Sequence, residues 1–554
     1  MKKYALLLLS AWAFFPALGQ STQPTQHDIV VYGATSGGIA AAIQGSRLGK
    51  SVLLIEPTQR IGGLTTGGLG QTDIGNKQVI GGISREFYQN IRKYYDNPSN
   101  WEWQERSEYV DGGQTRTVAG EDAMWTFEPS AALIVYEQMV ADERIELVRG
   151  VRLDRKEGVK KEGARITQIT TEGGDTYAGK IFIDATYEGD LMAAAGVTYF
   201  VGREANEVYG ETYNGVQLLK GHQFPDGVAP YVTPDDPGSG LLWGISPNEL
   251  DKQGSGDTLV QAYNFRICLT DEKENQAPIT KPDDYDASRY ELLARLFVAQ
   301  PTKQDINQYF IWSSMPNDKT DINNRGGFST DMINGSHAYP EASYAEREAI
   351  VKSHEDYTKG LLYFYATDPR VPTELQQEMQ RWGYPKDEYQ ANGHWSPQLY
   401  VREARRMIGE QVMTQAHCVG EETVDDPIGM AAYTMDSHNC QRIVIEKGGA
   451  AMVKNEGNVE VGGFPPYPVS YRSIVPKQNE ATNLLVPVCL SASHIAFGSI
   501  RMEPVFMVLG QSAATAAVLA IDSARAVQQV SYAALRKQLE SDNQILEHQD
   551  STKQ

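Results

Sequence analysis

A glycine-rich turn near the start of the chain carries the residue types that bind a dinucleotide. The turn, Gly33-Ala-Thr-Ser-Gly-Gly38, lies between an apolar run and an Ala-rich run. Gly33 permits a sharp turn at the end of a strand, and Gly38 permits the next helix to lie close to that strand. Backbone N–H groups at the start of the helix would face a pyrophosphate, which the helix dipole attracts. Thr35 stands where the usual motif has its middle glycine.

A carboxylate follows at the distance expected of a residue that holds the ribose. Glu56 ends a second apolar run, 51–56, and comes 23 residues after Gly33. A spacing of roughly 20 residues is typical of the acidic residue that binds ribose hydroxyls. Its negative charge disfavours the 2′-phosphate of NADP. An ordinary glycine-rich turn in another α/β protein is the alternative, and it leaves the carboxylate without a role.

The loop after Glu56 favours FAD over NAD. It reads Arg60-Ile-Gly-Gly63 and continues into a run with three further glycines, 64–70. Backbone without side chains permits close approach of a ligand. The pattern resembles FAD-binding proteins of the glutathione-reductase type, in which this loop lies along the diphosphate and reaches toward the flavin.

Two histidines could act as the base that a flavin-dependent oxidation needs. Such a base removes the proton of the hydroxyl or amine that is oxidised, and histidine can do so near neutral pH. His494 closes a Ser-Ala-Ser-His loop before a small-residue helix and is the first candidate. His438 follows Asp436 by two residues, and a carboxylate can hold an imidazole in one tautomer. A structural histidine is the alternative at both positions, and His417 is a weaker candidate.

Three arginines close together in the sequence could bind the carboxylate of a uronic acid. Arg402, Arg405 and Arg406 follow Tyr400 on a predicted helix, where residues 402 and 406 would share a face. Salt bridges to acidic neighbours are the alternative. The predicted catalytic residues are His494, His438, Asp436 and Arg402. No His/Cys/Asp cluster has the spacing of metal ligands, so no metal site is predicted.

An α/β fold must position these residues. Strands are expected at 28–32, 51–56, 181–186 and 483–488, helices at 39–48 and 507–517, and an antiparallel meander at 146–179. Residues from about 205 to 395 lose the α/β rhythm and are rich in Pro, Asp, Tyr and Asn. They predict an inserted substrate domain, with a helix at about 341–367.

The predicted fold class is therefore α/β, with a discontinuous FAD/NAD(P)-binding Rossmann-like domain, a β-meander and an inserted α+β substrate or cap domain. The predicted boundaries are 1–19 for a signal peptide, 27–205 and 395–530 for the FAD-binding domain, 206–394 for the insert and 531–554 for a C-terminal tail that frays after Glu540. The residues predicted to bind FAD are Gly33, Thr35, Ser36, Gly37, Gly38, Glu56, Gly62, Gly63, Thr65, Val151, Ala185, Thr186, Asp190, Arg501, Gly510 and Gln511. Arg501 is placed there because it precedes the expected start of a helix at Gly510-Gln511.

Composition predicts a soluble globular protein of more than one domain. The chain has 554 residues, 41% of them hydrophobic and 22% charged. Its net charge is −21, and −23 once Lys2 and Lys3 leave with a signal peptide. Such a charge excludes non-specific binding to nucleic acid or anionic lipid. The four cysteines are widely separated and are expected to be mostly buried thiols.

Residues 1–19 have the features of a Sec-type signal peptide. Lys2 and Lys3 precede an apolar run, and Ala17-Leu-Gly19 is a small-x-small cleavage site. We therefore expect a secreted, periplasmic or extracellular protein that acquires FAD outside the cytoplasm. No later segment is expected to be long and apolar enough to span a bilayer.

Five motifs together resemble the secreted bacterial FAD-dependent oxidoreductase family, whose members are often labelled xanthan lyase-like. The motifs are Gly33-Ala-Thr-Ser-Gly-Gly38 with Glu56 and Ile61-Gly-Gly63, Asp184-Ala-Thr-Tyr-Glu-Gly-Asp190, Tyr400-Val-Arg-Glu-Ala-Arg-Arg406, Tyr433-Thr-Met-Asp-Ser-His438, and the run 483–517. The resemblance covers nearly the whole mature chain. It implies a glutathione-reductase-type FAD-binding fold and a role in carbohydrate metabolism.

The predicted function is a FAD-dependent oxidoreductase that transfers a hydride from an alcohol, or less favourably an amine, of a sugar-like small molecule to the flavin. The electron acceptor is left open among oxygen, a quinone and a periplasmic carrier. Two alternatives belong to other classes. One is a polysaccharide (uronate) lyase, which needs no flavin, and the other is a non-catalytic glycan-binding protein that retains the fold.

Overall fold

The structure, a computed structural model, describes residues 25–112 and 120–548. The predicted signal peptide at 1–19 and the end of the predicted tail at 549–554 lie outside the described residues.

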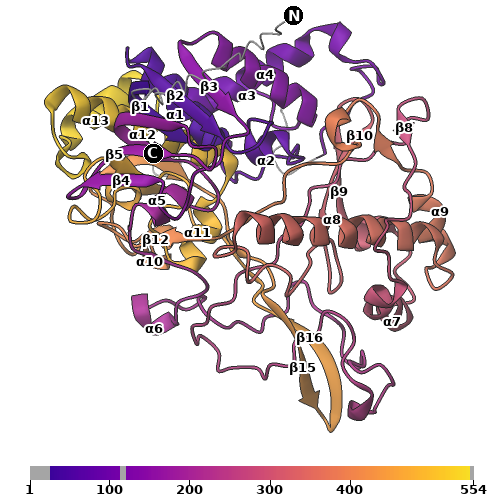
Figure 1. Cartoon of the computed structure of the whole chain (residues 1–554). Helices are drawn as coiled ribbons and strands as arrows, with labels where there is room; N and C mark the ends of the chain where they lie inside the picture. Colours follow the sequence, from indigo (N-terminus) through magenta and orange to yellow (C-terminus); the bar gives the residue numbers. More distant parts are fainter. Residues whose placement is uncertain (1–24, 113–119, 549–554) are drawn as a thin grey trace, which may run out of the picture.

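A seven-stranded sheet forms the centre of one half of the molecule (Figure 1). Its strands are β1 (Thr25–Tyr32), β2 (Val52–Glu56), β3 (Ile145–Arg149), β4 (Val159–Glu162), β5 (Arg165–Thr170), β6 (Thr176–Asp184) and β19 (Leu484–Leu485). Their order is β3-β2-β1-β6-β5-β4, and β19 pairs in parallel with the C-terminal end of β6. Because β1, β2, β3 and β6 are parallel, their C-terminal ends meet at one edge, where the glycine-rich turn begins.

Alternate residues of β1 face two separate cores. Ile29 and Val31 belong to the core that also holds the helices, whereas Val30 and Tyr32 belong to a smaller core that includes residues of β5. Successive side chains of a strand point to opposite faces of the sheet, so an unbroken apolar strand is buried on both sides. The apolar runs of the sequence therefore predicted β1 and β2 correctly.

Helices α1 (Ser36–Arg47) and α12 (Glu503–Ser523) pack against each other on the face of the sheet that carries Ile29 and Val31. Their contact depends on two glycines. A Cβ on Gly510 would lie 2.0 Å from the carbonyl oxygen of Gly37, and a Cβ on Gly37 would lie 2.9 Å from that of Phe506. The two helix backbones are therefore closer than any side chain would permit.

α12 is, within the described parts of the chain, the one helix long and apolar enough to cross a membrane, so the expectation from composition was wrong at this helix. Of its apolar window, 89% is buried inside the protein, as in the core helix of a globular protein. It contacts α1, α3 (Gly82–Asp96) and β13 (Pro427–Ala431).

The other elements surround the sheet or build the insert. Helices of the cofactor half are α2 (Gly63–Thr66), α3 (Gly82–Asp96), α4 (Pro129–Ala141), α5 (Asp190–Ala194), α10 (Gln415–Val419), α11 (His494–Ile500) and α13 (Tyr532–Ser541). The insert holds α6 (Asn206–Tyr209), α7 (Glu291–Ala299), α8 (Tyr344–Thr367), α9 (Thr373–Met379), and strands β8 (Gln276–Ala277), β9 (Phe310–Met315), β10 (Lys319–Asn324) and β11 (Tyr384–Pro385). Short strands elsewhere are β7 (Tyr199–Phe200), β12 (Arg406–Met407), β13 (Pro427–Ala431), β14 (Met435–Ser437), β17 (Val459–Val461) and β18 (Tyr467–Ser470).

The long helix α8 runs through the insert beside the sheet half of the molecule (Figure 1). A hairpin of β15 (Gln441–Lys447) and β16 (Ala450–Glu456) extends away from that half in the same view. The hairpin packs on the first part of the insert. Glu456 of the hairpin accepts hydrogen bonds from the backbone N–H of Gln217 at 2.7 Å and from Arg203 at 2.7 Å.

Four details of the sequence prediction were wrong. Residues 146–149 belong to β3, a parallel strand at the edge of the sheet beside β2, and not to the meander. Without β3, the apolar strand β2 would itself be the open edge of the sheet. Residues 400–406 are extended, since Tyr400 pairs with Asn264 and Arg406 with Phe200.

The other two corrections concern the C-terminal part of the chain. Gly510 lies in the interior of α12, which begins at Glu503. The described tail after Glu540 is packed, because Leu546 is buried and Gln544 donates to the carbonyl oxygen of Val508 at 2.9 Å.

The α1–α12 contact yields a stability prediction. Gly510→Ala should lower the free energy of unfolding by about 1–3 kcal/mol because of overpacking, although helix propensity alone favours alanine by about 1 kcal/mol. Urea unfolding of the purified protein measures the difference. Gly112→Ala, where an added methyl group would meet no atom within 4 Å, is the matched control and should leave the midpoint unchanged. Equal stability of the two variants would contradict the proposed helix contact.

Candidate functional site

The glycine-rich turn adopts the geometry that an anion-binding turn needs. Gly33 has a φ of +97°, and a Cβ there would lie 2.8 Å from Thr186. A Cβ on Gly38 would lie 1.8 Å from the carbonyl oxygen of Gly33. Thr35 caps α1 by accepting from the N–H of Gly38 at 3.3 Å and donates to the carbonyl oxygen of Ala185 at 2.7 Å. The first N–H groups of a helix have no partner within it and are available to a phosphate.

Glu56 lies beside this turn at the end of β2. Its carboxylate accepts hydrogen bonds from the N–H of Ala34 and the N–H of Thr58, each at 2.8 Å. Burial raises the pKa of Glu56, and these hydrogen bonds act against that shift. They also hold the side chain in one orientation toward the cavity that it lines.

We call the space over the turn the first cavity. Its volume is about 370 Å³, and an adjoining hollow of about 550 Å³ shares Pro57, Thr58 and Arg152 with it. Of the residues predicted to bind FAD, the first cavity is lined by Gly33, Thr35, Glu56, Gly63, Thr186 and Asp190, and the adjoining hollow by Val151. The C-terminal ends of β1, β2 and β6 and the loop after β3 are far apart in the chain. Their residues thus meet at one cleft.

Other predicted cofactor residues lie behind the cleft. Gly37 packs on α12, and Ala185 accepts the hydrogen bond from Thr35. Thr65 donates to Glu503 at 3.0 Å, and Ser36 donates to the carbonyl oxygen of the same residue. Gly62 has a φ of +95°, which sets the turn into α2.

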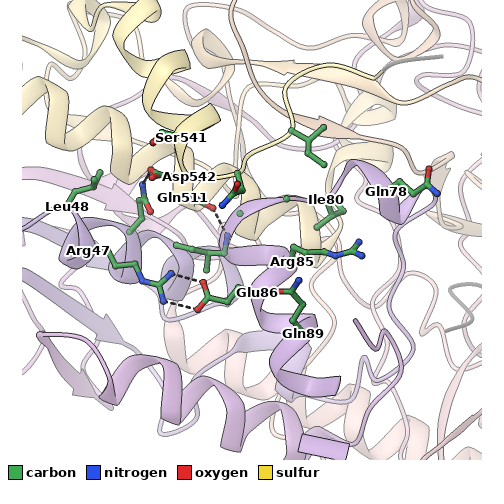
Figure 2. A pocket seen from close by; sticks show the side chains of 16 residues that line it. Arg47, Leu48, Gln78, Ile80, Arg85, Glu86, Gln89, Gln511, Ser541 and Asp542 are labelled. Atoms are coloured by element: carbon green, nitrogen blue, oxygen red, sulfur yellow. Dashed lines mark hydrogen bonds and ion pairs between the residues drawn. The ribbon is translucent and has the colours of Figure 1, made fainter. Parts of the chain in front are cut away.

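Gln511 lies at a different place. Its side chain accepts a hydrogen bond from the N–H of Ile83 at 2.8 Å and lines a surface groove of about 820 Å³. Figure 2 shows this groove with the Arg47–Glu86 ion pair at its side. Gln511 and Gly510 thus contact neighbouring helices, and neither lines the first cavity.

Asp190 joins the first cavity to the insert. Its carboxylate contacts three guanidiniums, those of Arg155 at 3.1 Å, Arg347 at 2.6 Å and Arg405 at 2.9 Å. Burial opposes ionisation of Asp190, but the three cations outweigh it and lower its pKa. The three guanidiniums thus hold the carboxylate of Asp190 in one position at the wall of the first cavity.

A second cavity of about 550 Å³ lies between the cofactor half and the insert. It is lined by Gln71, Asp73, Gly221, His222, Arg266, Ile311, Ser313, Asn323, Asn324, Arg325, Gly326, Tyr433, Thr434, Asp436, His438 and Glu460. Ile311 is the one aliphatic side chain among the described residues of this lining. The cavity therefore presents hydrogen-bonding groups on nearly all sides.

His438 is held between two carboxylates in this second cavity. Its Nδ1 lies 2.8 Å from Asp331, and its Nε2 lies 3.5 Å from Asp436. Burial opposes the charge on Asp436, but His438 and Arg501 lower its pKa well below the ordinary range. Asp436 is therefore ionised, and each ring nitrogen of His438 faces a carboxylate.

The aspartates around the second cavity are matched with arginines. Arg402 pairs with Asp331 at 2.9 Å, Arg501 with Asp436 at 3.0 Å, and Arg266 with Asp321 at 2.6 Å. These three ion pairs satisfy the charges of six side chains at the junction between the two halves. Pairing is the condition under which such charges can be buried.

Tyr400 lies between the two cavities. The guanidinium of Arg402 lies 4.8 Å from the centre of its ring, and Arg501 donates to its hydroxyl at 3.1 Å. Leu399, the preceding residue, lines the first cavity. The Nε atoms of Arg402 and Arg501 are buried and have no hydrogen-bond partner within the described structure.

The two cavities and the orphaned donors together fit an elongated cofactor. The loop 64–70 connects Gly63 of the first cavity to Gln71 of the second. FAD has a pyrophosphate for the glycine-rich turn, ribose hydroxyls for Glu56, and a flavin with acceptor atoms for buried arginine N–H groups. The residues present therefore fit FAD.

His494, the first base candidate from the sequence, lies in a different environment. It is buried, its Nδ1 lies 2.7 Å from Glu403, and its Nε2 lies 2.9 Å from the hydroxyl of Ser437. Burial lowers the pKa of His494 to about 3, so the imidazole is neutral. It lines neither the first nor the second cavity.

Sequence reasoning missed two aspartates, one that lines the second cavity and one that lies in its wall. Asp331 is 107 residues from His438 in the chain, and nothing in the local sequence indicates their contact. Asp73 follows the loop 64–70 directly, and this position beside a cofactor loop was an available signal. Arg347 on α8 was missed for the same reason as Asp331, because its partner Asp190 lies 157 residues away.

Comparison with solved structures found partial similarities to flavoenzymes. Thioredoxin reductase of T. acidophilum is 18% identical, with 29% of this chain and 34% of that chain covered and a TM-score of 0.16. L-proline dehydrogenase of P. horikoshii is 15% identical, with 33% and 59% covered and a TM-score of 0.23. Bacillithiol disulfide reductase of Staphylococcus aureus is 16% identical, with 33% and 42% covered and a TM-score of 0.18.

These scores are too low to carry an argument about substrate, and the chain spans only about a third to three fifths of those solved chains. A search of the curated proteins found no match. The model of one protein family, described as FAD dependent oxidoreductase, matches residues 28–539. The match extends from β1 through α13 and includes the glycine-rich turn, the insert and both cavities. The chain belongs to the FAD-dependent oxidoreductase family and uses FAD as its cofactor.

Proposed function

We propose that this oxidoreductase acts on a hydroxyl group of a carbohydrate-like small molecule, with His438 as the base. One observation carries the proposal: His438 lines a cavity in which most of the lining side chains are polar, and it is held there by two carboxylates. An apolar or aromatic substrate would leave those groups without partners, at a cost of about 1–3 kcal/mol for each buried group. A polyhydroxylated substrate supplies donors and acceptors on every side.

The residues divide the work between the two cavities. The turn at Gly33 and the carboxylate of Glu56 would hold the pyrophosphate and ribose of FAD, and Arg402 and Arg501 would donate to the flavin. FAD, when bound, supplies the acceptor for the hydride that leaves the substrate carbon. His438 takes the hydroxyl proton at Nε2, while Asp331 accepts a hydrogen bond from Nδ1–H. The positive charge that results is stabilised by Asp331 and Asp436.

The three arginines do not support the alternative of a uronate lyase that the sequence left open. Arg402 pairs with Asp331, and Arg405 pairs with Asp190 and with Glu341 at 2.9 Å. Arg406 pairs with Glu204 at 2.7 Å and also contacts Glu403. Each guanidinium thus pairs with at least one protein carboxylate, and none of the three lines the second cavity.

The cofactor assignment yields a binding prediction. Purified protein should carry close to one FAD per chain, and Glu56→Gln should weaken FAD binding by about 10- to 100-fold, because hydrogen bonds to a charged group contribute about 1.5–3 kcal/mol. Titration of the apoprotein with FAD, followed by quenching of flavin fluorescence, measures the affinity. Glu374→Gln, on exposed α9, is the matched control. A colourless protein that binds no added FAD would refute the assignment of the first cavity.

The base assignment yields a kinetic prediction. His438→Asn should slow the reduction of bound flavin by the best substrate of a sugar panel by about 10²- to 10⁴-fold, which is the usual contribution of a general base. Anaerobic stopped-flow bleaching of the flavin measures the rate, and the spectrum of bound FAD should not change. His394→Asn is the matched control, since His394 has a φ of +65°, a conformation that asparagine tolerates.

His494→Asn separates the two histidines. It removes a buried imidazole that bridges Glu403 and Ser437, so we expect a lower melting temperature. A folded, FAD-loaded His494→Asn protein with the same loss of rate as His438→Asn would overturn the choice of His438.

A further inference from the structure

Asp73 is the aspartate of the second cavity without a guanidinium of its own. Asp321, Asp331 and Asp436 each contact an arginine at 3.0 Å or less. Asp73 reaches Arg266 only at 3.4 Å, and that guanidinium already pairs with Asp321 at 2.6 Å. Three arginines are thus matched to three aspartates, and Asp73 is the fourth.

The carboxylate of Asp73 is largely removed from water yet open to the cavity. Its side chain is 17% exposed, and Asp73 lines the second cavity. Burial raises the pKa of Asp73, and Arg266 only partly offsets this effect. A carboxyl group in such a place is expected to have hydrogen-bond donors around it. Among the described residues, its side-chain hydrogen bond to the protein is the long one from Arg266, so a donor from a ligand would complete its coordination.

Asp73 also lies close to the proposed base. The charge of Asp436 acts on Asp73, and Asp436 is 3.5 Å from the Nε2 atom of His438. Both Asp73 and His438 line the same cavity. A substrate whose hydroxyl reaches Nε2 therefore occupies the cavity that Asp73 also lines.

The chemistry of the donor follows from the local charges. The proposed function assigns a hydroxyl to His438, and an anionic group beside it would face both Asp73 and Asp436. A neutral hydroxyl donates to a carboxylate without that repulsion, and two adjacent hydroxyls on one ring can reach His438 and Asp73 together.

We propose that Asp73 determines specificity by accepting a hydrogen bond from the hydroxyl adjacent to the one that is oxidised, so that the substrate is a vicinal diol of a sugar ring. This inference rests on the proposed function. His438 receives the proton of the oxidised hydroxyl, whereas the adjacent hydroxyl keeps its proton and only donates to Asp73. A site built to bind a hydroxyl strongly rejects the analogue without it, because its own polar group is then left unpaired.

The test compares pairs of substrates on pairs of enzymes. A panel of methyl pyranosides is first screened for anaerobic flavin reduction by the wild-type holoenzyme. The active sugar and its monodeoxy analogues are then compared by kcat/KM on wild type, on Asp73→Ala, which removes the acceptor, and on Asp236→Asn. Asp236 is an exposed helix cap that accepts from the N–H of Gly238, a role that asparagine also fills, so this variant is the control.

The expected result is a discrimination that depends on Asp73. Wild type and Asp236→Asn should prefer the sugar over the analogue lacking the adjacent hydroxyl by about 100-fold or more. In Asp73→Ala the preference should fall to about 10-fold or less, with the FAD spectrum and melting temperature retained. A preference that is unchanged in folded Asp73→Ala would overturn the role of Asp73.

The wild-type enzyme provides a second measurement that needs no variant. If every monodeoxy analogue that keeps the oxidised hydroxyl reduces the flavin as fast as the sugar does, the vicinal-diol inference is wrong while the proposed function stands. If no pyranoside reduces the flavin although FAD is bound, the proposed carbohydrate substrate fails, and the inference fails with it.

Discussion

Pairing of buried charges where the insert meets the cofactor half is the constraint on which this structure depends. Charged groups removed from water must be matched, since breaking one partner of a buried pair costs several kcal/mol. Arg402 of the cofactor half pairs with Asp331 of the insert, 71 residues away in the chain. Asp190 does the same with Arg347 of α8. The insert is therefore held in one position by electrostatic complementarity as well as by apolar contact.

This matching also decides which groups remain available for chemistry. The arginines that the sequence offered as carboxylate binders are used in pairs, and His494 is neutral and bound to Glu403. His438 faces a polar cavity with a carboxylate at each nitrogen, and Asp73 keeps only one long contact. The same residue types thus have structural roles where they are fully paired and chemical roles where a cavity leaves them a free position.

A second constraint acts on the backbone around the cofactor cleft. α1 and α12 approach so closely that neither Gly37 nor Gly510 can carry a side chain, and Gly38 lies against the carbonyl oxygen of Gly33. This packing directs the start of α1 toward the cleft and brings the segment before α12, with Arg501, to the edge of the second cavity. The cofactor turn and the polar cavity are therefore parts of one assembly, connected by the loop 64–70.

The sequence by itself determined the local parts of this protein. Strands β1 and β2, helix α1, the turn at Gly33 and the carboxylate of Glu56 follow from apolar runs, glycine positions and a spacing of 23 residues, all of which act over short distances in the chain. The same local reasoning failed where partners are remote. The run 400–406 has the composition of a helix, but pairing with Asn264 and Phe200 keeps it extended. Only the tertiary structure decided that His438 meets Asp331, that His494 is neutral, and that Asp73 lacks a matching arginine. Hydrogen bonds, desolvation and charge depend on distance in space, and that distance is set by packing rather than by separation along the chain.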